Sequence, residues 1–187
     1  MKKIIILTLA LGSIIGAKAQ EYVDLGLSVN WATHDVGATS PYEAGSIFIV
    51  GTAIEAGPKN KPAKRTLSHQ EDISGNPQYD AATANWGPEW RTPTYAEWSE
   101  LMGSCTWVFE TLYINDKTVE GHRIIGPNGN SIFMLTTDTM QSLCSTPNTK
   151  KKGKMWVFAH IKDKKMLWTP GKHPYYCLGT SRPVRDK

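Results

Sequence analysis

Alternating apolar and polar residues predict most of the β-structure of this chain. From residue 22 to residue 36, apolar side chains recur at every second position, which is typical of a strand or a strand pair with one buried face. Further strands are predicted over residues 45–53, 106–114, 118–126 and 131–137. The recurring apolar residues of the first segment are Val23, Leu25, Leu27, Val29 and Trp31.

Turn residues separate these segments. Asn128-Gly129 is the strongest hairpin signal in the chain, and it predicts a type I′ turn because both central residues of that turn need positive φ. Another hairpin is predicted over residues 154–168. The closing segment, "CLGTSRPVRD", predicts a terminal strand that Pro183 confines to an edge or an end.

Two short helices are predicted before the β-rich region. Asp80 is a suitable N-cap for the first helix, and Gly87 is expected to end it. Thr94 and Glu97 have the spacing of a capping box, which predicts the start of the second helix. Gly103 is expected to end that helix. Its apolar residues fall on one face: Tyr95, Trp98, Leu101 and Met102.

The first nineteen residues have the pattern of a secretory signal peptide. Two lysines precede an apolar run over residues 4–17, and Ala17-Lys18-Ala19 matches the small-x-small pattern of a cleavage site. The run is shorter than the roughly 20 apolar residues of a membrane-spanning helix. We therefore expect cleavage after Ala19 and an exported protein that is periplasmic, attached to the cell surface or secreted.

Removal of this leader changes the charge and the length of the chain. Three lysines are lost with it, so the formal net charge falls from +4 to +1. A charge this small gives little electrostatic support for nucleic-acid binding. The 168 residues that remain, 20–187, suit one domain. No transmembrane segment is expected in this mature chain.

The cysteine and histidine residues do not form a recognisable metal or catalytic motif. Three cysteines allow three single disulfides, and their spacing does not select one. The five histidines make no HExxH pattern or close pair of ligands. His34 followed by Asp35 has the composition of a base and its orienting carboxylate, but no nucleophile motif accompanies it. We expect no metal and no cofactor.

Several stretches resemble the Fibrobacter succinogenes major paralogous domain family, exported domains common in gut and rumen Bacteroidetes. They are "YVDLGLSVNWATHDVGATSP", "DAATANWGPEWRTPTYAEWSELMGSCTW", "GHRIIGPNGNSIFML" and "GTSRPV". The matches follow the family's order over nearly the whole mature chain. The family is similar to C-type-lectin-like folds and, more distantly, to the formylglycine-generating enzyme group. That group shares the helix start R-x-P-T-x-x-E-W, here Arg91, Pro93, Thr94, Glu97 and Trp98.

The resemblance implies an α+β fold of the C-type-lectin-like kind, with two short helices and twisted antiparallel sheets. It implies no established activity, and two departures bear on function. Relatives often carry cysteine at the position of His34 together with one at Cys105, and if those two pair in relatives, Cys105 has lost its partner here. The candidate disulfide of this chain is Cys144 with Cys177. Relatives also tend to carry a "YWSS" strand where this chain has a lysine-rich segment. The tripeptides typical of calcium-dependent lectins are absent.

The tryptophans are predicted to be mainly structural. Trp31, Trp98 and Trp107 occupy periodic positions and are expected in the core. Trp86 and Trp90 flank Gly-Pro-Glu between the two predicted helices, and we expect them to pack over the start of the second one.

The leading hypothesis is an exported, non-enzymatic binding or interaction domain with a glycan or glycoprotein ligand. Its recognition surfaces are expected on the loop over residues 54–78 and on the basic hairpin over residues 150–168, because rigid scaffolds commonly present function on loops. The alternative for the hairpin is a solvated basic rim. The candidate ligand-binding residues are Lys151, Lys152, Lys154, Trp156, Lys164, Lys165 and Trp168.

Two other functions remain open at this point. An enzyme descended toward the formylglycine-generating group would have Cys144 and Cys177 facing one another in a cleft, with a perturbed thiol. A structural subunit of a surface assembly is the third alternative.

Charge reversal tests the basic-hairpin hypothesis. The double variant Lys151→Glu, Lys152→Glu should bind fewer anionic glycans on a glycan array than the unchanged protein, because two attractive charges become repulsive. Unchanged binding would end the hypothesis of a basic ligand site.

Overall fold

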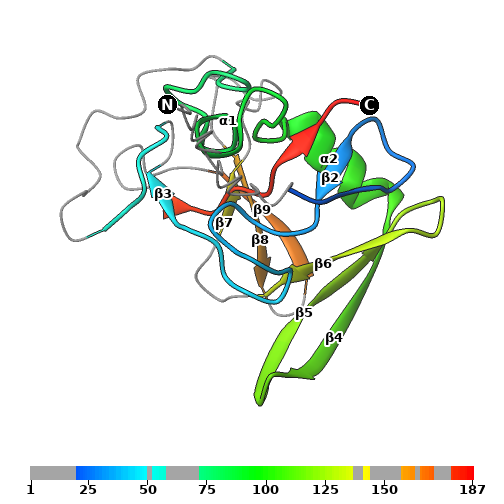
Figure 1. Cartoon of the computed structure of the whole chain (residues 1–187). Helices are drawn as coiled ribbons and strands as arrows, with labels where there is room; N and C mark the ends of the chain where they lie inside the picture. The colour runs from blue at the N-terminus through cyan, green and yellow to red at the C-terminus, as the bar shows by residue number, and fades with distance from the viewer. Residues whose placement is uncertain are drawn as a thin grey trace, which may run out of the picture.

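The computed structural model describes residues 20–49, 52–57, 72–136 and 178–187, together with the backbone of three further strands near the C-terminus. In this part of the chain, two short helices and antiparallel sheets give an α+β architecture (Figure 1), as predicted. The predicted leader, residues 1–19, lies outside the described residues. No helix in the described part has the length and apolar character needed to cross a membrane.

The described strands pair into four small antiparallel sheets. The first has the order β1-β2-β11, and the second pairs β3 with β10. The third has the order β4-β5-β6, and the fourth β7-β8-β9. The bounds are β1 Tyr22–Asp24, β2 Asn30–Ala32, β3 Phe48–Ile49, β4 Thr106–Ile114, β5 Lys117–Ile125, β6 Ser131–Leu135, β7 Gln141–Leu143, β8 Val157–Lys162, β9 Lys165–Pro170, β10 Leu178–Gly179 and β11 Val184–Arg185.

Most strand predictions are confirmed, but one is too long. The segment over residues 22–36 contains the short strand pair β1–β2, and β4 has the predicted bounds. The strand predicted over residues 45–53 is reduced to the two residues of β3. After β3 the chain folds back, because the Ile49 N–H donates to the Ile54 carbonyl at 2.9 Å. Pro183 directly precedes β11, which is an edge strand, as predicted.

The type I′ turn lies in a different hairpin from the predicted one. In the loop between β5 and β6, only Gly129 has positive φ, and its N–H donates to the Gly126 carbonyl at 3.0 Å. That geometry is a type I turn followed by a left-handed glycine, and Pro127 suits its first central position. The two positive-φ residues lie instead at Asn115 and Asp116, between β4 and β5. The prediction of a type I′ turn at Asn128-Gly129 is therefore wrong.

Both helices begin with the predicted caps. The Asp80 carboxylate accepts from two backbone amides at the start of α1, Ala81–Trp86, and Gly87 ends this helix at φ +95°. Thr94 and Glu97 form the complete capping box at the start of α2, Tyr95–Ser104. Gly103 does not end α2, because the helix continues to Ser104 and Cys105 is its C-cap. The Cys105 N–H still donates to the Leu101 carbonyl, at 3.3 Å, so the helical hydrogen bonding outlasts the glycine.

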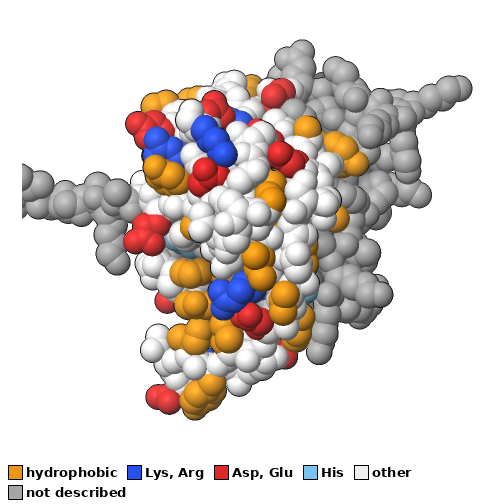
Figure 2. Space-filling view, turned by 90° about the vertical axis from the view of Figure 1, so that its right-hand side faces the viewer, with side chains coloured by type: hydrophobic (Ala, Val, Ile, Leu, Met, Phe, Trp, Pro, Cys, Tyr) orange, Lys and Arg blue, Asp and Glu red, His pale blue; other side chains and the backbone are white. Residues whose placement is uncertain are grey.

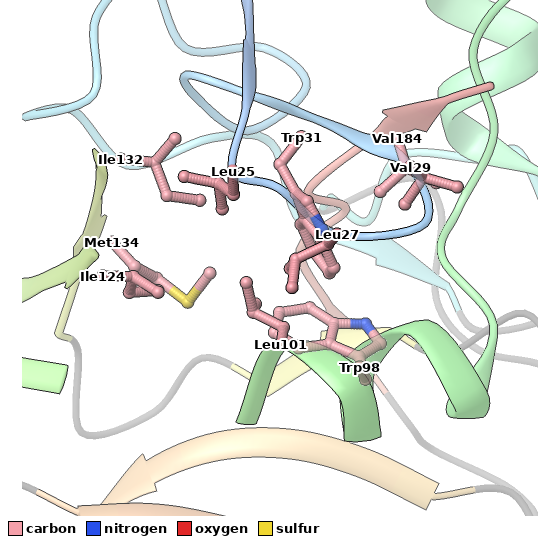
Figure 3. Packing of buried hydrophobic residues seen from close by; sticks show 10 residues of the cluster. All are labelled: Leu25, Leu27, Val29, Trp31, Trp98, Leu101, Ile124, Ile132, Met134 and Val184. Atoms are coloured by element: carbon pink, nitrogen blue, oxygen red, sulfur yellow. The ribbon is translucent and has the colours of Figure 1, made fainter. Parts of the chain in front are cut away.

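The main core lies between α2, the β1–β2 segment and the sheet of β5 and β6 (Figure 3). Trp98 and Leu101 project from α2 toward Leu27 and Trp31 of the β1–β2 segment. The rings of Trp31 and Trp98, both fully buried, meet edge to face with centroids 5.0 Å apart. The buried members of this core are Leu25, Leu27, Val29, Trp31, Trp98, Leu101, Ile124, Ile132, Met134 and Val184. Trp107 is partly buried and packs against it, so the three predicted core tryptophans all contact the core.

Two buried charged side chains connect distant parts of the chain. The Asp80 carboxylate is fully buried and accepts from the amides of Gly75, Ala82 and Thr92 at 2.9 Å each. It also accepts from the Thr92 hydroxyl at 2.7 Å, so it joins α1 to the segment that leads into α2. Arg182, 2% exposed, donates to the carboxylate of Asp35 and to backbone carbonyls of β2 and β6.

Asp80→Ala should lower the free energy of unfolding by at least about 3 kcal/mol, because it leaves several buried N–H groups without an acceptor. Glu89→Ala is the matched control. The Glu89 carboxylate is 70% exposed and lies 3.3 Å from Arg185, so its loss should cost less than about 1 kcal/mol. Urea unfolding monitored by tryptophan fluorescence measures both. Equal costs for the two variants would contradict the role assigned to Asp80.

Candidate functional site

The predicted basic ligand site is not described at the level of side chains. Lys165 and Trp168 lie on β9, where they pair with Lys162 and Ala159 of β8. The hairpin predicted in this region is therefore present. The other predicted ligand-binding residues and the candidate disulfide lie outside the described residues: Lys151, Lys152, Lys154, Trp156, Lys164, Cys144 and Cys177. The basic-site hypothesis and the disulfide stay predictions.

Among the described residues, a pocket of about 300 Å³ brings aromatic and polar groups together. It lies between the segment before β1, the end of β2, the loop that follows it, and the C-terminal end of α1. We name it the His34–Trp86 pocket. Its lining residues are Gln20, Glu21, Thr33, His34, Ala38, Thr39, Ser40, Pro41 and Trp86.

The aromatic wall of the pocket is part of a row of rings. Trp86 is the last residue of α1, and its ring meets the His34 imidazole edge to face with centroids 5.3 Å apart. Trp86 also contacts Trp90 at 5.1 Å, and Trp90 contacts Tyr22 at 6.4 Å. The guanidinium of Arg185 lies over Tyr22 at 4.7 Å from the ring centroid. Trp90 is buried and Trp86 is only partly so, which leaves Trp86 for contact with a ligand.

His34 supplies the titratable group on this wall. Its Nδ1 lies 2.9 Å from the Thr33 hydroxyl oxygen. Partial burial lowers the pKa of His34 below its ordinary value of 6.5, and the positive charge of Arg182 lowers it further. The imidazole is therefore neutral at pH 7, and a neutral ring has one nitrogen that donates and one that accepts.

Asp35 does not serve His34 as an orienting carboxylate. It forms an ion pair with Arg182 instead, through the guanidinium Nε. The same guanidinium donates to the Thr33 carbonyl at 3.1 Å. The predicted pair of a base and its orienter is therefore replaced by an ion pair that holds the backbone on both sides of His34.

The loop after β2 is held in place at both ends. The Val36 N–H donates to the Ser181 carbonyl at 2.9 Å, and the Ser46 N–H donates to the Val36 carbonyl at 2.8 Å. Gly37 has φ +87°, and a Cβ there would lie 2.3 Å from the Ser46 hydroxyl oxygen, so this close turn needs glycine. The pocket residues 38–41 lie within the loop so formed.

A second hollow, of about 430 Å³, is lined by residues of the same loop. Ser40 lines both hollows. Across from it stand residues of the β4–β5 hairpin, and the charged groups of this hollow are Glu43 and Lys117. The Thr39 hydroxyl and amide donate to the Glu43 carboxylate at 2.6 and 3.1 Å, which lowers the pKa of Glu43. Tyr42 is the aromatic residue of its lining.

The R-x-P-T-x-x-E-W segment, residues 91–98, has a structural role. Arg91 donates two hydrogen bonds to the Glu97 carboxylate, at 2.9 and 2.6 Å, and one to Asp186 at 2.8 Å. Glu97 also accepts from the Thr94 amide at 2.7 Å, and Trp98 is fully buried in the core. The arginine, the capping box and the tryptophan thus attach α2 to the C-terminal segment.

Cys105 is a free thiol that packs partly buried against the main core. Burial raises the pKa of this thiol, and the nearby carboxylate of Glu100 raises it further. A raised pKa reduces the fraction of reactive thiolate at neutral pH. Within the described residues, no group of three His, Cys, Asp or Glu side chains suits a metal ion.

Comparison with known proteins adds no relative: no protein-family model, no curated protein and no solved structure matches this chain. The family resemblance therefore stays a prediction. The two short helices and the antiparallel sheets agree with what it implies, and such elements occur in many folds.

The sequence did not indicate the His34–Trp86 pocket. The sequence relates His34 to its neighbour Asp35 and, through the family resemblance, to Cys105, and it relates Trp86 to Trp90. Trp86, the last residue of α1, contacts Trp90, and the packing of both over the start of α2 stays a prediction. The contact between Trp86 and His34 joins segments that share no local pattern. A lone histidine in a loop and a tryptophan at the end of a helix carry no spacing signal that would bring them together.

Protonation of His34 should lower the free energy of unfolding in mild acid. The unfolded chain takes up a proton at His34 near pH 6.5, whereas the folded chain takes it up only at lower pH, so stability is lost as the pH falls from about 6.5 through the folded pKa. His34→Gln removes the titration, so this part of the pH dependence should disappear. NMR titration of His34 and urea unfolding between pH 7.5 and pH 5 provide the check. An unchanged pH dependence in the variant would exclude His34 as the cause.

Proposed function

We propose that the protein is an exported, non-enzymatic binding or interaction domain of C-type-lectin-like architecture, with a glycan or glycoprotein as its ligand. The single observation that carries the proposal is the combination of Trp86 and His34 with hydroxyl and carboxyl groups in one open pocket. We assign recognition of a sugar to this pocket.

The chemistry of the pocket suits a sugar better than a charged or a purely apolar ligand. A sugar has apolar C–H faces that pack on aromatic rings, and hydroxyl groups that need donors and acceptors. Trp86 offers an aromatic surface. Thr33, Thr39 and Ser40 line the pocket with hydroxyl groups, and the neutral imidazole of His34 adds a donor and an acceptor. The volume of about 300 Å³ is at the lower limit of small-molecule pockets, which suits the end of a glycan chain.

The polar groups around the pocket support binding rather than catalysis. A base that acts on a nucleophile is usually oriented by a third group. Here the Asp35 carboxylate is engaged by Arg182, and the His34 Nδ1 lies against Thr33. These pairs fix the shape of the site and leave its chemistry to hydrogen bonding and ring contact. The basic hairpin remains a second candidate surface.

The test compares Trp86→Ala with Tyr113→Ala. Tyr113 is the matched control because it is an exposed aromatic residue, 74% accessible, on the β4–β5 hairpin and outside the pocket. Removing Trp86 should weaken glycan binding at least about tenfold, since a lost aromatic contact is worth roughly 1.5 kcal/mol. Removing Tyr113 should leave binding unchanged. A glycan array identifies the ligand, and calorimetric titration gives the affinities.

Two controls keep the outcome interpretable. Trp86 also packs against the small buried cluster around Val36 and Phe48, so each variant is checked by near-ultraviolet circular dichroism before binding is measured. Trp86→Tyr retains an aromatic ring and should recover part of the affinity. A folded Trp86→Ala variant that binds like the unchanged protein would overturn the assignment to this pocket. Turnover of a bound glycan would overturn the non-enzymatic proposal.

A further inference from the structure

The second hollow shares part of its wall with the His34–Trp86 pocket. Ser40 lines both of them. The Thr39 hydroxyl, which belongs to the pocket, donates to the Glu43 carboxylate of the second hollow at 2.6 Å. The Glu43 N–H donates in turn to the Ser40 carbonyl at 3.3 Å, so this part of the loop is closed on itself. The pocket and the second hollow are therefore neighbouring parts of one surface.

The apolar surface of the second hollow comes from the loop after β2 and from the β4–β5 hairpin. Ile114 and Val119 line it from the hairpin. Ile114 pairs with Lys117, two residues before Val119, so the three side chains lie on one face of the sheet. The Tyr42 ring contacts the Phe133 ring of β6, with centroids 5.3 Å apart, which attaches the loop to this sheet. An aromatic ring beside two branched aliphatic side chains suits the C–H face of a sugar.

Lys117, in the same hollow, is a cation without an ionic partner in the described part of the chain. The structure describes the side chains of six lysine and arginine residues, and five of them form salt bridges. Figure 2 shows this arrangement on one face of the molecule, where basic side chains lie beside acidic ones. The ammonium group of Lys117 is exposed, and it can pair with an anionic group of a ligand. The five residues in salt bridges are Arg91, Arg123, Arg182, Arg185 and Lys187.

Glu43 is the acidic group of the second hollow, and it is already held in place. Its Oε2 accepts from the Thr39 amide at 3.1 Å and from the Thr39 hydroxyl. These hydrogen bonds lower the pKa of Glu43, and the positive charge of Lys117 lowers it further. The carboxylate is therefore ionised at neutral pH, and its Oε1 can accept from hydroxyl groups of a ligand.

The His34–Trp86 pocket has the opposite charge preference. Glu21 is its charged lining residue, no lysine or arginine belongs to its lining, and the His34 imidazole is neutral at pH 7. The Glu21 carboxylate repels an anionic group, whereas the Trp86 ring suits the apolar face of a neutral sugar. The charges thus assign a neutral group to the pocket and an anionic group to the second hollow.

We propose that the ligand is an acidic oligosaccharide that occupies both the pocket and the second hollow, an inference that rests on the proposed function and extends it. A neutral end residue packs on Trp86, the chain passes Ser40, and a following residue places its carboxylate or sulfate group at Lys117. The hydroxyl groups of that residue donate to Glu43, and its C–H face packs on Tyr42. A neutral sugar would offer no anion to Lys117, and an apolar acid would offer no hydroxyl groups to Glu43.

Lys117→Gln tests this proposal, with Lys117→Arg and Lys187→Gln as matched variants. Lys187→Gln removes the same charge outside both hollows, where Lys187 pairs with Asp24 at 3.0 Å. The protein as its host processes it is applied to an array of matched neutral, carboxylated and sulfated oligosaccharides, and calorimetric titration gives the affinities. The unchanged protein should prefer acidic members. Lys117→Gln should weaken their binding about fivefold, near the upper end for an exposed ion pair, and leave neutral members unchanged.

The control variants should keep the acidic preference, because both retain the charge in the second hollow. Circular dichroism establishes that each variant is folded. The carboxylated and sulfated members show which anionic group Lys117 accepts. Higher salt should weaken the binding of acidic members alone, since it screens an exposed ion pair. Equal affinity for neutral and acidic members, or an acidic preference that survives Lys117→Gln, would overturn the proposal. A preference lost in Lys151→Glu, Lys152→Glu instead would assign the anion to the basic hairpin.

Trp86→Ala separates this proposal from the assignment of the pocket. It should weaken neutral and acidic members alike, because both place a neutral residue on the Trp86 ring. An effect of Trp86→Ala without an effect of Lys117→Gln would leave the pocket assigned and overturn the acidic ligand. An effect of Lys117→Gln alone would overturn the binding across both hollows together with the assignment of the pocket. Binding of no array member would overturn both proposals.

Discussion

The candidate site depends on the hydrogen bonds of one buried group, the guanidinium of Arg182. A charge 2% exposed must have its hydrogen bonds satisfied inside the protein, and Arg182 satisfies them with Asp35 and with the carbonyls of Ala32, Thr33 and Phe133. These partners belong to the end of β2 and to β6, while Arg182 itself belongs to the C-terminal segment. One side chain thus holds three parts of the chain around His34. Because the Asp35 carboxylate is paired with Arg182, it does not orient His34. The His34 ring lines the pocket instead, where it contacts Trp86.

The loop after β2 connects this buried contact to the surface. It leaves the Arg182 ion pair at Asp35, turns at Gly37 and returns to bond Val36 through Ser46. Residues 38–41 then line the His34–Trp86 pocket, and Ser40 also lines the hollow beside the β4–β5 hairpin. A loop fixed by backbone hydrogen bonds can present the same polar groups to a ligand without a large entropic cost of ordering. The pocket is in this sense carried by a rigid scaffold.

Several elements could be predicted because their signals are local. The capping box of Thr94 and Glu97 spans four residues, and it forms as the spacing indicates. The period-two pattern of the first segment correctly indicates its buried residues, although the chain bends between β1 and β2. The misplaced type I′ turn shows the limit of such signals. Asn128-Gly129 is a better match to that turn than Asn115-Asp116, but the loop after β5 is held against Asp24 by Asn128 and Asn130 side chains, each at 2.9 Å. Tertiary hydrogen bonds there select another turn type.

The amino-acid sequence by itself determined the helix starts, the strand periodicity and the tryptophans that form the core, because caps and periodicity act between residues a few positions apart. Only the tertiary structure decided which partner each polar side chain has. Asp35 lies next to His34 in the chain yet bonds Arg182, 147 residues away, and His34 meets a tryptophan from another element. A buried charge is tolerated only when it has a hydrogen-bonding partner. The complete tertiary fold supplies that partner, and the fold depends on all contacts of the chain together. The pocket exists only as a result of that fold, so no short stretch of sequence encodes it.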